Sequence, residues 1–189
     1  MIILVVLALS IVVAFWRGGR FGNLAHLNLR WRGVILAGFL IQVLIFSSFW
    51  QDRAETYALT NWGYILSLLV LLVALVYNYR LPGMTVITLG FFLNFVAIAL
   101  NGGYMPASPM AMQAAGRVLL LPGQVSSNSI GMGPQTILFF LGDVLAIPQG
   151  FIFPNVFSIG DVVIAIGAVI LTQKGLLPSP TLPDQSPKT

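Results

Sequence analysis

The sequence predicts an all-α polytopic transmembrane helical bundle of about five spanning helices, and three observations support this class. Hydrophobic residues make up 58% of the 189 residues and charged residues only 7%, which is too little polar surface for a soluble globule of this length. Apolar runs of nearly membrane length recur along the chain. Most of the nine Lys and Arg residues stand beside these runs, as expected at membrane boundaries.

The predicted spans are taken in chain order. A spanning helix needs about 20 residues, and the first four apolar runs approach that length: 1–16, 33–50, 62–79 and 84–100. A fifth span runs from about 159 to 177, where Lys174 can reach the lipid headgroups. The first run has no basic segment before it and no small-residue cleavage pattern after it, so we expect a retained helix rather than a signal peptide.

Between the fourth and fifth spans lies a long segment, 101–158, with two features. In "ASPMAMQAAGRVLLLPG", Ser108 is a candidate N-cap, Pro109 the first helical residue and Gly123 the residue after the end, which predicts a short interfacial helix. In "GPQTILFFLGDVLAIP", the apolar stretch between its two prolines is too short to cross a bilayer. It predicts a short re-entrant or buried segment.

The basic residues indicate which ends of the spans face the cytoplasm. With the N-terminus outside and the C-terminus cytoplasmic, seven bases fall inside and two outside, whereas a crossing by the "GPQTILFFLGDVLAIP" segment reduces the bias to five against four. We therefore prefer five spans to six. We expect residues 1–177 to form a single transmembrane domain, and 178–189 a flexible Pro- and Ser-rich cytoplasmic tail.

Composition also restricts the chemistry. The chain has no cysteine and one histidine, which excludes thiolate and multi-histidine metal sites, so we expect no metal and no cofactor. The net charge of +4 arises from bases near apolar runs, which indicates the lipid bilayer rather than nucleic acid as the partner. Other membrane protein subunits are a further possible kind of partner. Within "RGGRFGNLAHLNLRWRG", a short amphipathic helix would contact lipid headgroups through four arginines: Arg17, Arg20, Arg30 and Arg32.

Two acids lie in or next to apolar segments, where an ionisable group needs a specific reason. Asp143 and Asp161 each follow an apolar-Gly pair, and the prolines between them allow the chain to turn back and bring the two carboxyl groups together. Two adjacent carboxyl groups that share a proton are the arrangement of an aspartyl hydrolase. The alternatives are structural: Asp161 with Ser158 resembles a capping arrangement, and Asp143 would bond to the backbone of a broken helix.

Amides and hydroxyls near the outer end of the bundle form a second candidate site. Asn94 and Asn101 lie two turns apart on one face of the fourth span. Asn155 and Ser158 precede the fifth span at the same end. We interpret these four residues as a binding or structural polar cluster.

Several motifs together resemble a family of bacterial multi-pass membrane proteins classed only as a domain of unknown function. They are "RGGRFGNLAHLNLRWRG", "LIQVL", "LNGGYMP", "FLGDVLAIP" and "PNVFSIGDVVIAIG", in this order over almost the whole chain. The resemblance implies a location in the bacterial cytoplasmic membrane and no assigned activity.

A second resemblance covers the C-terminal third alone. "FPNVFSIGDVVIAIGAVIL" is similar to the last motif and helix of signal peptidase II, an intramembrane aspartyl protease. This implies Asp161 and Asp143 as the catalytic acids. In this chain Asn155 stands six residues before Asp161, rather than the three that the motif has.

Three functions follow from these patterns. The favoured one is a binding, assembly or structural subunit whose polar cluster lies at the outer side of the bundle. The alternatives are an intramembrane aspartyl hydrolase that uses Asp143 and Asp161, and a small-solute or ion transporter.

Overall fold

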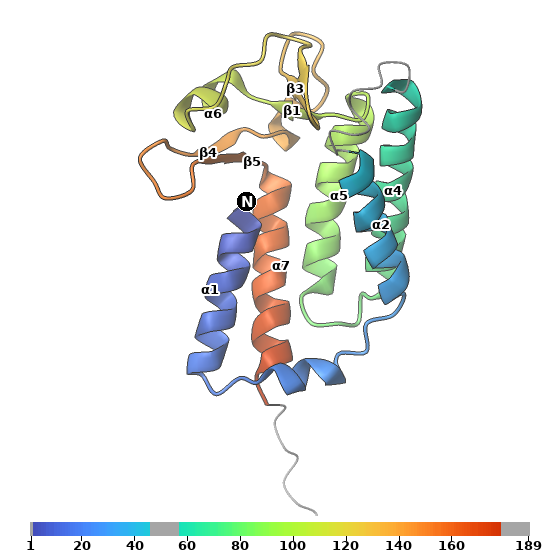
Figure 1. Ribbon diagram of the computed structural model, residues 1–189, viewed down its shortest axis with the longest axis vertical. Helices are drawn as coiled ribbons and strands as arrows, with labels where there is room; N and C mark the ends of the chain where they lie inside the picture. The colour runs from blue at the N-terminus through green and yellow to red at the C-terminus, as the bar shows by residue number, and fades with distance from the viewer. Residues whose placement is uncertain (1, 46–56, 179–189) are drawn as a thin grey trace, which may run out of the picture.

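The computed structural model of the protein describes residues 2–45 and 57–178, and these are mostly helical (Figure 1). The long helices are α1 (Ile2–Trp16), α2 (Arg32–Ile45), α4 (Tyr57–Tyr77), α5 (Met84–Leu100) and α7 (Ile159–Leu176). The short helices are η1 (Phe21–His26), α6 (Pro109–Ala114) and η3 (Phe139–Leu141). The strands are β1 (Met105–Ala107), β2 (Val125–Ser126), β3 (Ser129–Gly131), β4 (Leu145–Ile147) and β5 (Asn155–Phe157).

Each predicted apolar run forms a helix. The largest difference at a described helix end is the start of α4 at Tyr57, ahead of the predicted 62, and the end of the 33–50 run lies outside the described residues. By length and composition α7 alone, among the described helices, could cross a membrane by itself. The shorter apolar helices are Ile3–Trp16, Arg32–Ile45, Asn61–Tyr77 and Met84–Leu100.

The long helices form a curved row with α5 and α7 near its middle. Along the row, α1 packs on α7, α7 on α5, α5 on α4, and α4 on α2 (Figure 1). The beginning of α1 lies near the beginning of α7, and the chain passes up and down through the bundle. Segment 101–158 leaves α5 and enters α7 at this same end, and we call it the cap.

Glycines bring α5 and α7 into backbone contact. A Cβ placed on Gly90 would lie 2.5 Å from the Gly160 carbonyl oxygen, and one on Gly167 would lie 2.8 Å from the Gly83 carbonyl oxygen. No side chain larger than hydrogen fits at such distances. The two helices therefore meet through small residues, as membrane helices commonly do, and this contact sets the position of the first turn of α7 against Asn94 of α5.

The cap contains strands, so the all-α prediction is wrong in this region. A three-stranded sheet has the order β1-β3-β2, with β1 parallel and β2 antiparallel to β3, and β4 pairs antiparallel with β5. Each strand has only two or three residues, which is too short for an alternating pattern to be visible in the sequence. The pairing of β1 with β3 also joins segments far apart in the chain.

The two features predicted within the cap turn out differently. The helix that follows Ser108 exists with the predicted cap and proline, since the Ser108 hydroxyl accepts a hydrogen bond from the Ala111 N–H, but it ends at Ala114 rather than near Gly123. The predicted re-entrant segment does not enter the bundle. It folds as turns, η3 and β4 within the cap, where the Asp143 N–H donates to the Pro106 carbonyl at 2.7 Å.

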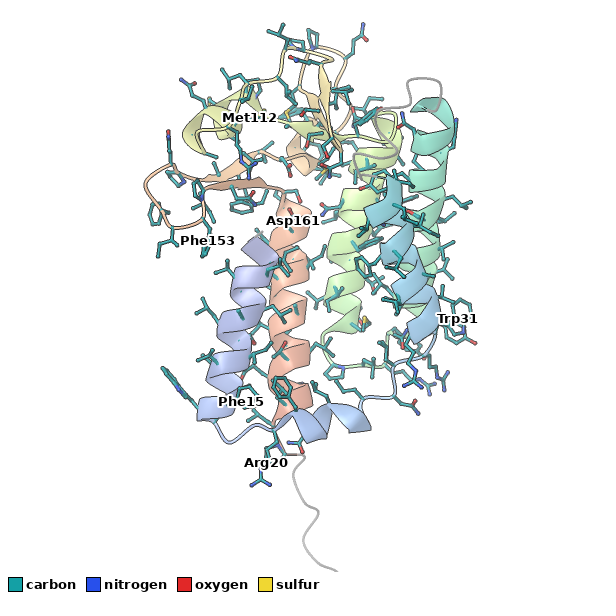
Figure 2. The ribbon with its side chains drawn as sticks, viewed as in Figure 1. Phe15, Arg20, Trp31, Met112, Phe153 and Asp161 are labelled. Atoms are coloured by element: carbon teal, nitrogen blue, oxygen red, sulfur yellow. The ribbon has the colours of Figure 1, made fainter. Side chains whose placement is uncertain are left out.

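The end of the bundle opposite the cap carries the basic loop. Part of the predicted amphipathic loop helix is present as η1, whose Asn23 amide donates to the Leu176 carbonyl at 2.7 Å. Figure 2 shows Arg20 and Trp31 at this end and Asp161 at the cap end of α7. The predicted tail from residue 179 onward lies outside the described residues.

Candidate functional site

A cavity of about 570 Å³ lies beneath the cap, between the long helices. All five long helices and the cap contribute residues to its wall, and most of these residues are apolar. Tyr64, Leu68, Leu71 and Leu75 of α4 line it in sequence, which corresponds to about 16 Å along the helix axis. The cavity is therefore long and narrow, with its long axis parallel to the bundle.

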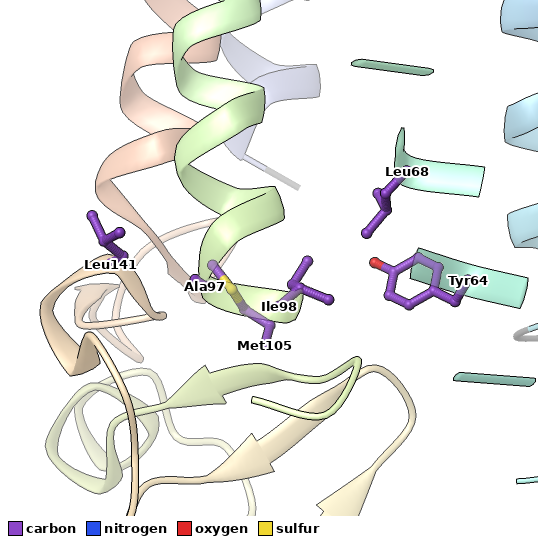
Figure 3. Packing of buried hydrophobic residues seen from close by; sticks show 6 residues of the cluster. All are labelled: Tyr64, Leu68, Ala97, Ile98, Met105 and Leu141. Carbon is purple, nitrogen blue, oxygen red and sulfur yellow. The ribbon is translucent and has the colours of Figure 1, made fainter. Parts of the chain in front are cut away.

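Buried residues from α4, α5 and the cap pack around the end of this cavity that lies next to the cap. Figure 3 shows Tyr64 and Leu68 of α4 pointing toward Ile98 of α5, with Met105 of β1 beside it. The buried Tyr64 side chain is hydrogen-bonded to Asn128 of the cap, which ties the cap to α4. Residues of the cap therefore close one end of the cavity.

Polar residues are concentrated at the cap end of the cavity. Asn94, Asn128, Asp143 and Asp161 all line it there, from α5, the cap and α7. Gln42 of α2 is a further polar residue in the wall, and its amide lies 3.5 Å from the Ser67 hydroxyl. No Lys or Arg is among the described residues that line the cavity, so its polar end has acidic character.

Asp161 is held in a closed hydrogen-bond network at the start of α7. Its N–H donates to the Ser158 hydroxyl at 3.0 Å, and the Ser158 N–H donates to its Oδ2 at 3.3 Å, which completes the capping box predicted from the sequence. The Asn94 amide donates to Asp161 Oδ1 at 2.8 Å, while the Ser158 hydroxyl donates to the Asn94 Oδ1 at 2.7 Å. Both carboxylate oxygens therefore have donors from the protein.

Asp143 lies in a different environment. Its backbone continues the pairing with β1, since its carbonyl accepts a hydrogen bond from the Ser108 N–H at 3.0 Å. Its carboxyl group, by contrast, has no hydrogen-bond partner within residues 2–45 and 57–178, so the predicted bond to a broken helix is absent there. Burial, and then the nearby charge of Asp161, raise the pKa of Asp143 to about 7.

The two aspartates are thus brought to one cavity, and the predicted polar cluster is only partly assembled. Asn94 and Ser158 join Asp161, but Asn101 instead caps α5 and exchanges hydrogen bonds with the backbone of Ile137, at 2.9 and 3.0 Å. The buried Asn155 accepts a hydrogen bond from Arg117 at 3.2 Å, inside the cap.

Some cavity residues were missed by sequence reasoning. Asn128 lies in a polar turn of the cap, and Tyr64 and Gln42 resemble ordinary polar residues of a membrane helix. A local signal for Tyr64 existed, because Leu68, Leu71 and Leu75 follow it at helical spacing on the same face. Nothing local connected Asn128 to that face.

The predicted headgroup arginines lie at the end of the bundle opposite the cap. Arg17 donates to the Gln173 side chain at 2.8 Å, and the Arg20 backbone N–H donates to the Leu176 carbonyl at 2.9 Å. Arg30 is held through its backbone by Asn78, and Arg32 begins α2. In the described part of the chain, no three His, Cys, Asp or Glu side chains gather closely enough to hold a metal ion.

The sequence matches the model of a family of unknown function, DUF5317, over residues 26–173, which is most of the chain. The chain belongs to this family. The matched region contains α2, α4, α5, the cap and nearly all of α7, and so it includes both aspartates and the amides around them. No curated protein and no solved structure matches the chain. The expected membership of a family known only as a domain of unknown function is thereby confirmed.

Proposed function

We propose that this DUF5317 protein is embedded in a membrane and binds one elongated amphipathic molecule in the cavity beneath the cap. The exposed surface of the long helices supports the membrane placement, because large apolar side chains on it are more than half exposed. Examples are Leu9, Leu36, Val43, Leu44, Leu66, Leu89 and Ile166. Such a surface is unfavourable in water and favourable in lipid.

The distribution of charge supports one orientation. In the described long helices, ionisable Asp, Glu, Lys and Arg residues occur only near helix ends, as Arg32, Asp161 and Lys174. The end opposite the cap carries a group of bases, namely Arg17, Arg20, Arg30, Arg32, Arg80 and Lys174. By the positive-inside rule this end faces the cytoplasm of a bacterium, and the cap and the start of α1 lie outside. The cap begins and ends on one side, which favours five spans over six.

The ligand class follows from the cavity. Its long apolar wall matches an alkyl chain, and its volume falls within the range of about 300 to 1,000 Å³ typical of small-molecule sites. Its polar end has two acids and no described base, so the ligand's polar end would donate hydrogen bonds or carry a positive charge. The observation that carries this proposal is Asp143, which lines the cavity and whose carboxyl group has no hydrogen-bond partner in the described chain.

The test uses hexadecylamine and hexadecanoate as matched probes on the purified protein in neutral nanodiscs, with native mass spectrometry as the readout. We expect a one-to-one complex with the amine and none with the carboxylate, which the acids repel. Asp143→Asn should weaken amine binding at least about tenfold, because a charge-assisted hydrogen bond contributes roughly 1.5 to 3 kcal/mol. Equal binding of both probes would overturn the proposal.

Neighbouring positions on α2 supply a matched steric control. Ile35 lines the cavity, whereas Leu36 is 61% exposed on the outer face. Ile35→Trp should block the amine complex, and Leu36→Trp should leave it unchanged. If both variants retain the complex, the molecule does not bind in this cavity.

The second candidate is an intramembrane aspartyl hydrolase. It is supported by one observation: Asp143 and Asp161 line the same cavity, and the charge of Asp161 acts on Asp143. Two carboxyl groups with different surroundings can divide the roles of acid and base. Purified protein should then cleave membrane peptides or lipids, and both Asp143→Asn and Asp161→Asn should be folded and inactive. No turnover by the wild type, together with amine binding, would favour the binding protein.

A further inference from the structure

A second hollow of about 530 Å³ lies at the basic end, and none of its lining residues lines the cavity beneath the cap. Its walls come from the end of α4 and the turn after it on one side, and from the loop before α2 on the other. Arg30, Arg80, Asn28 and Tyr79 supply its polar groups, while Val76 and Leu81 supply apolar wall. We propose that this hollow binds the phosphate group of an anionic glycerophospholipid of the inner leaflet.

The hollow is held in shape by a buried asparagine. The Asn78 side chain, 3% exposed, accepts a hydrogen bond from the Arg30 N–H at 2.8 Å and donates to the Arg30 carbonyl at 2.9 Å and to the Ala74 carbonyl at 2.7 Å. These bonds fasten the loop before α2 to the end of α4. The backbone of Arg30 therefore has a fixed position at the edge of the hollow, while its guanidinium group makes no hydrogen bond within the described residues.

Arg80 is oriented on the opposite wall. Its Nε donates to the Tyr79 hydroxyl at 3.0 Å, and its guanidinium lies 5.6 Å from the centre of the Tyr79 ring. The two terminal nitrogens keep their donors available for a ligand, since the structure gives them no acceptor in the described residues. A planar fork held in this way suits phosphate oxygens, which accept two parallel hydrogen bonds.

The charge at this end has no compensation from the described chain. Asp143 and Asp161 are the only acids within residues 2–45 and 57–178, and both line the cavity under the cap. An anion from outside the chain would therefore be attracted to the two guanidinium groups. Beside the hollow, Trp31 and Tyr77 stack with ring centres 4.7 Å apart, as aromatic residues at the headgroup level of a membrane would. This placement favours a lipid phosphate over a free one, and in this respect the inference rests on the membrane placement proposed above.

The test measures binding of dioleoylphosphatidylglycerol, dioleoylphosphatidylcholine and inorganic phosphate to the protein in neutral detergent, by native mass spectrometry. We expect a saturable one-to-one complex with phosphatidylglycerol, at least about tenfold weaker in the Arg30→Gln and Arg80→Gln double variant. The Arg20→Gln and Lys174→Gln double variant removes the same charge at the same end and should keep the complex. Arg30→Lys with Arg80→Lys should give an intermediate loss, because the charge stays and the planar forks are absent.

The outcomes distinguish a lipid phosphate from free phosphate, and they test this site independently of the proposed amine-binding cavity. Equal losses in both glutamine variants would overturn the hollow as a site and indicate unspecific attraction. Equal binding of phosphatidylcholine, or binding of inorganic phosphate without phosphatidylglycerol, would overturn the assignment of an anionic lipid. The measurement in detergent does not depend on which side of a membrane the basic end faces. A failure here therefore leaves the amine-binding test and the topology untouched.

Discussion

Asp143 and Asp161 line one cavity but differ in the partners of their carboxyl groups. Asp161 receives hydrogen bonds on both oxygens and joins α7 to Asn94 of α5, so its described contacts are those of a helix start and an interhelical link. Asp143 has no such bonds, and burial and the charge of Asp161 raise its pKa to about 7. At the residue scale, Asp143 is therefore the group free to interact with a ligand.

The raised pKa of Asp143 predicts a pH dependence of stability. The unfolded chain has an ordinary Asp pKa of about 4, so the folded protein binds the proton more tightly between about pH 4 and pH 7. The contribution of this group to the free energy of unfolding is fully present below pH 4 and is lost as the pH rises through 7. Asp143→Asn should flatten the fall in melting temperature between pH 5 and 8, and should be more stable than wild type at pH 8 by about 1 to 2 kcal/mol. An unchanged slope would contradict the burial of this carboxyl group.

Asn94 provides the second prediction at this scale. Asn94→Leu removes the donor to Asp161 and the acceptor of the Ser158 hydroxyl, which should lower the free energy of unfolding by about 2 to 3 kcal/mol. Thermal unfolding in detergent measures the loss. Gln42→Leu is the control, because the 3.5 Å bond from Gln42 to Ser67 is long and its loss should cost less than about 1 kcal/mol. Similar losses in the two variants would show that the network contributes little.

At the scale of elements, the contact between α5 and α7 depends on glycine. A Cβ at Gly90 would meet the Gly160 carbonyl at 2.5 Å and the Ile164 nitrogen at 2.7 Å, so neither helix can yield without a shift of its backbone. Gly90→Ala should destabilise the protein by about 1 to 3 kcal/mol. Gly63→Ala on α4 is the control, since its nearest atom would be the Ile45 Cδ1 at 3.9 Å, and it should be neutral or stabilising. Thermal unfolding of both variants measures the two changes in stability. If Gly90→Ala is as stable as wild type, the backbones of α5 and α7 do not lie this close.

At the scale of the whole molecule, the proposed orientation places the cap outside the cell and the basic end in the cytoplasm. The chain has no cysteine, so every introduced cysteine can be labelled uniquely. Val118 is 85% exposed in the cap, and Gly22 lies in η1 with open space around its Cβ position. A membrane-impermeant maleimide applied to intact cells should label the Val118→Cys variant and not the Gly22→Cys variant until the membrane is opened. The reverse pattern would place the basic end outside the cell and overturn the orientation.

The sequence by itself determined the number, order and approximate bounds of the long apolar helices, because a helix depends on local apolar length and local turn residues. It also determined the capping box of α7, since Ser158 and Asp161 meet within one helical turn. Family membership followed from motifs spread over the chain.

Only the tertiary structure decided the strands of the cap, the cavity and the surroundings of the two aspartates. Strand β1 forms because β3, a distant segment of the chain, supplies its hydrogen bonds, whereas β2 pairs with β3 across a short turn. In the same way, the helix packing that places Asn94 against Asp161 depends on glycines that are far apart in the sequence. Whether a carboxyl group finds hydrogen-bond partners or lines a cavity without them depends on such contacts between segments. Local sequence patterns do not predict these contacts.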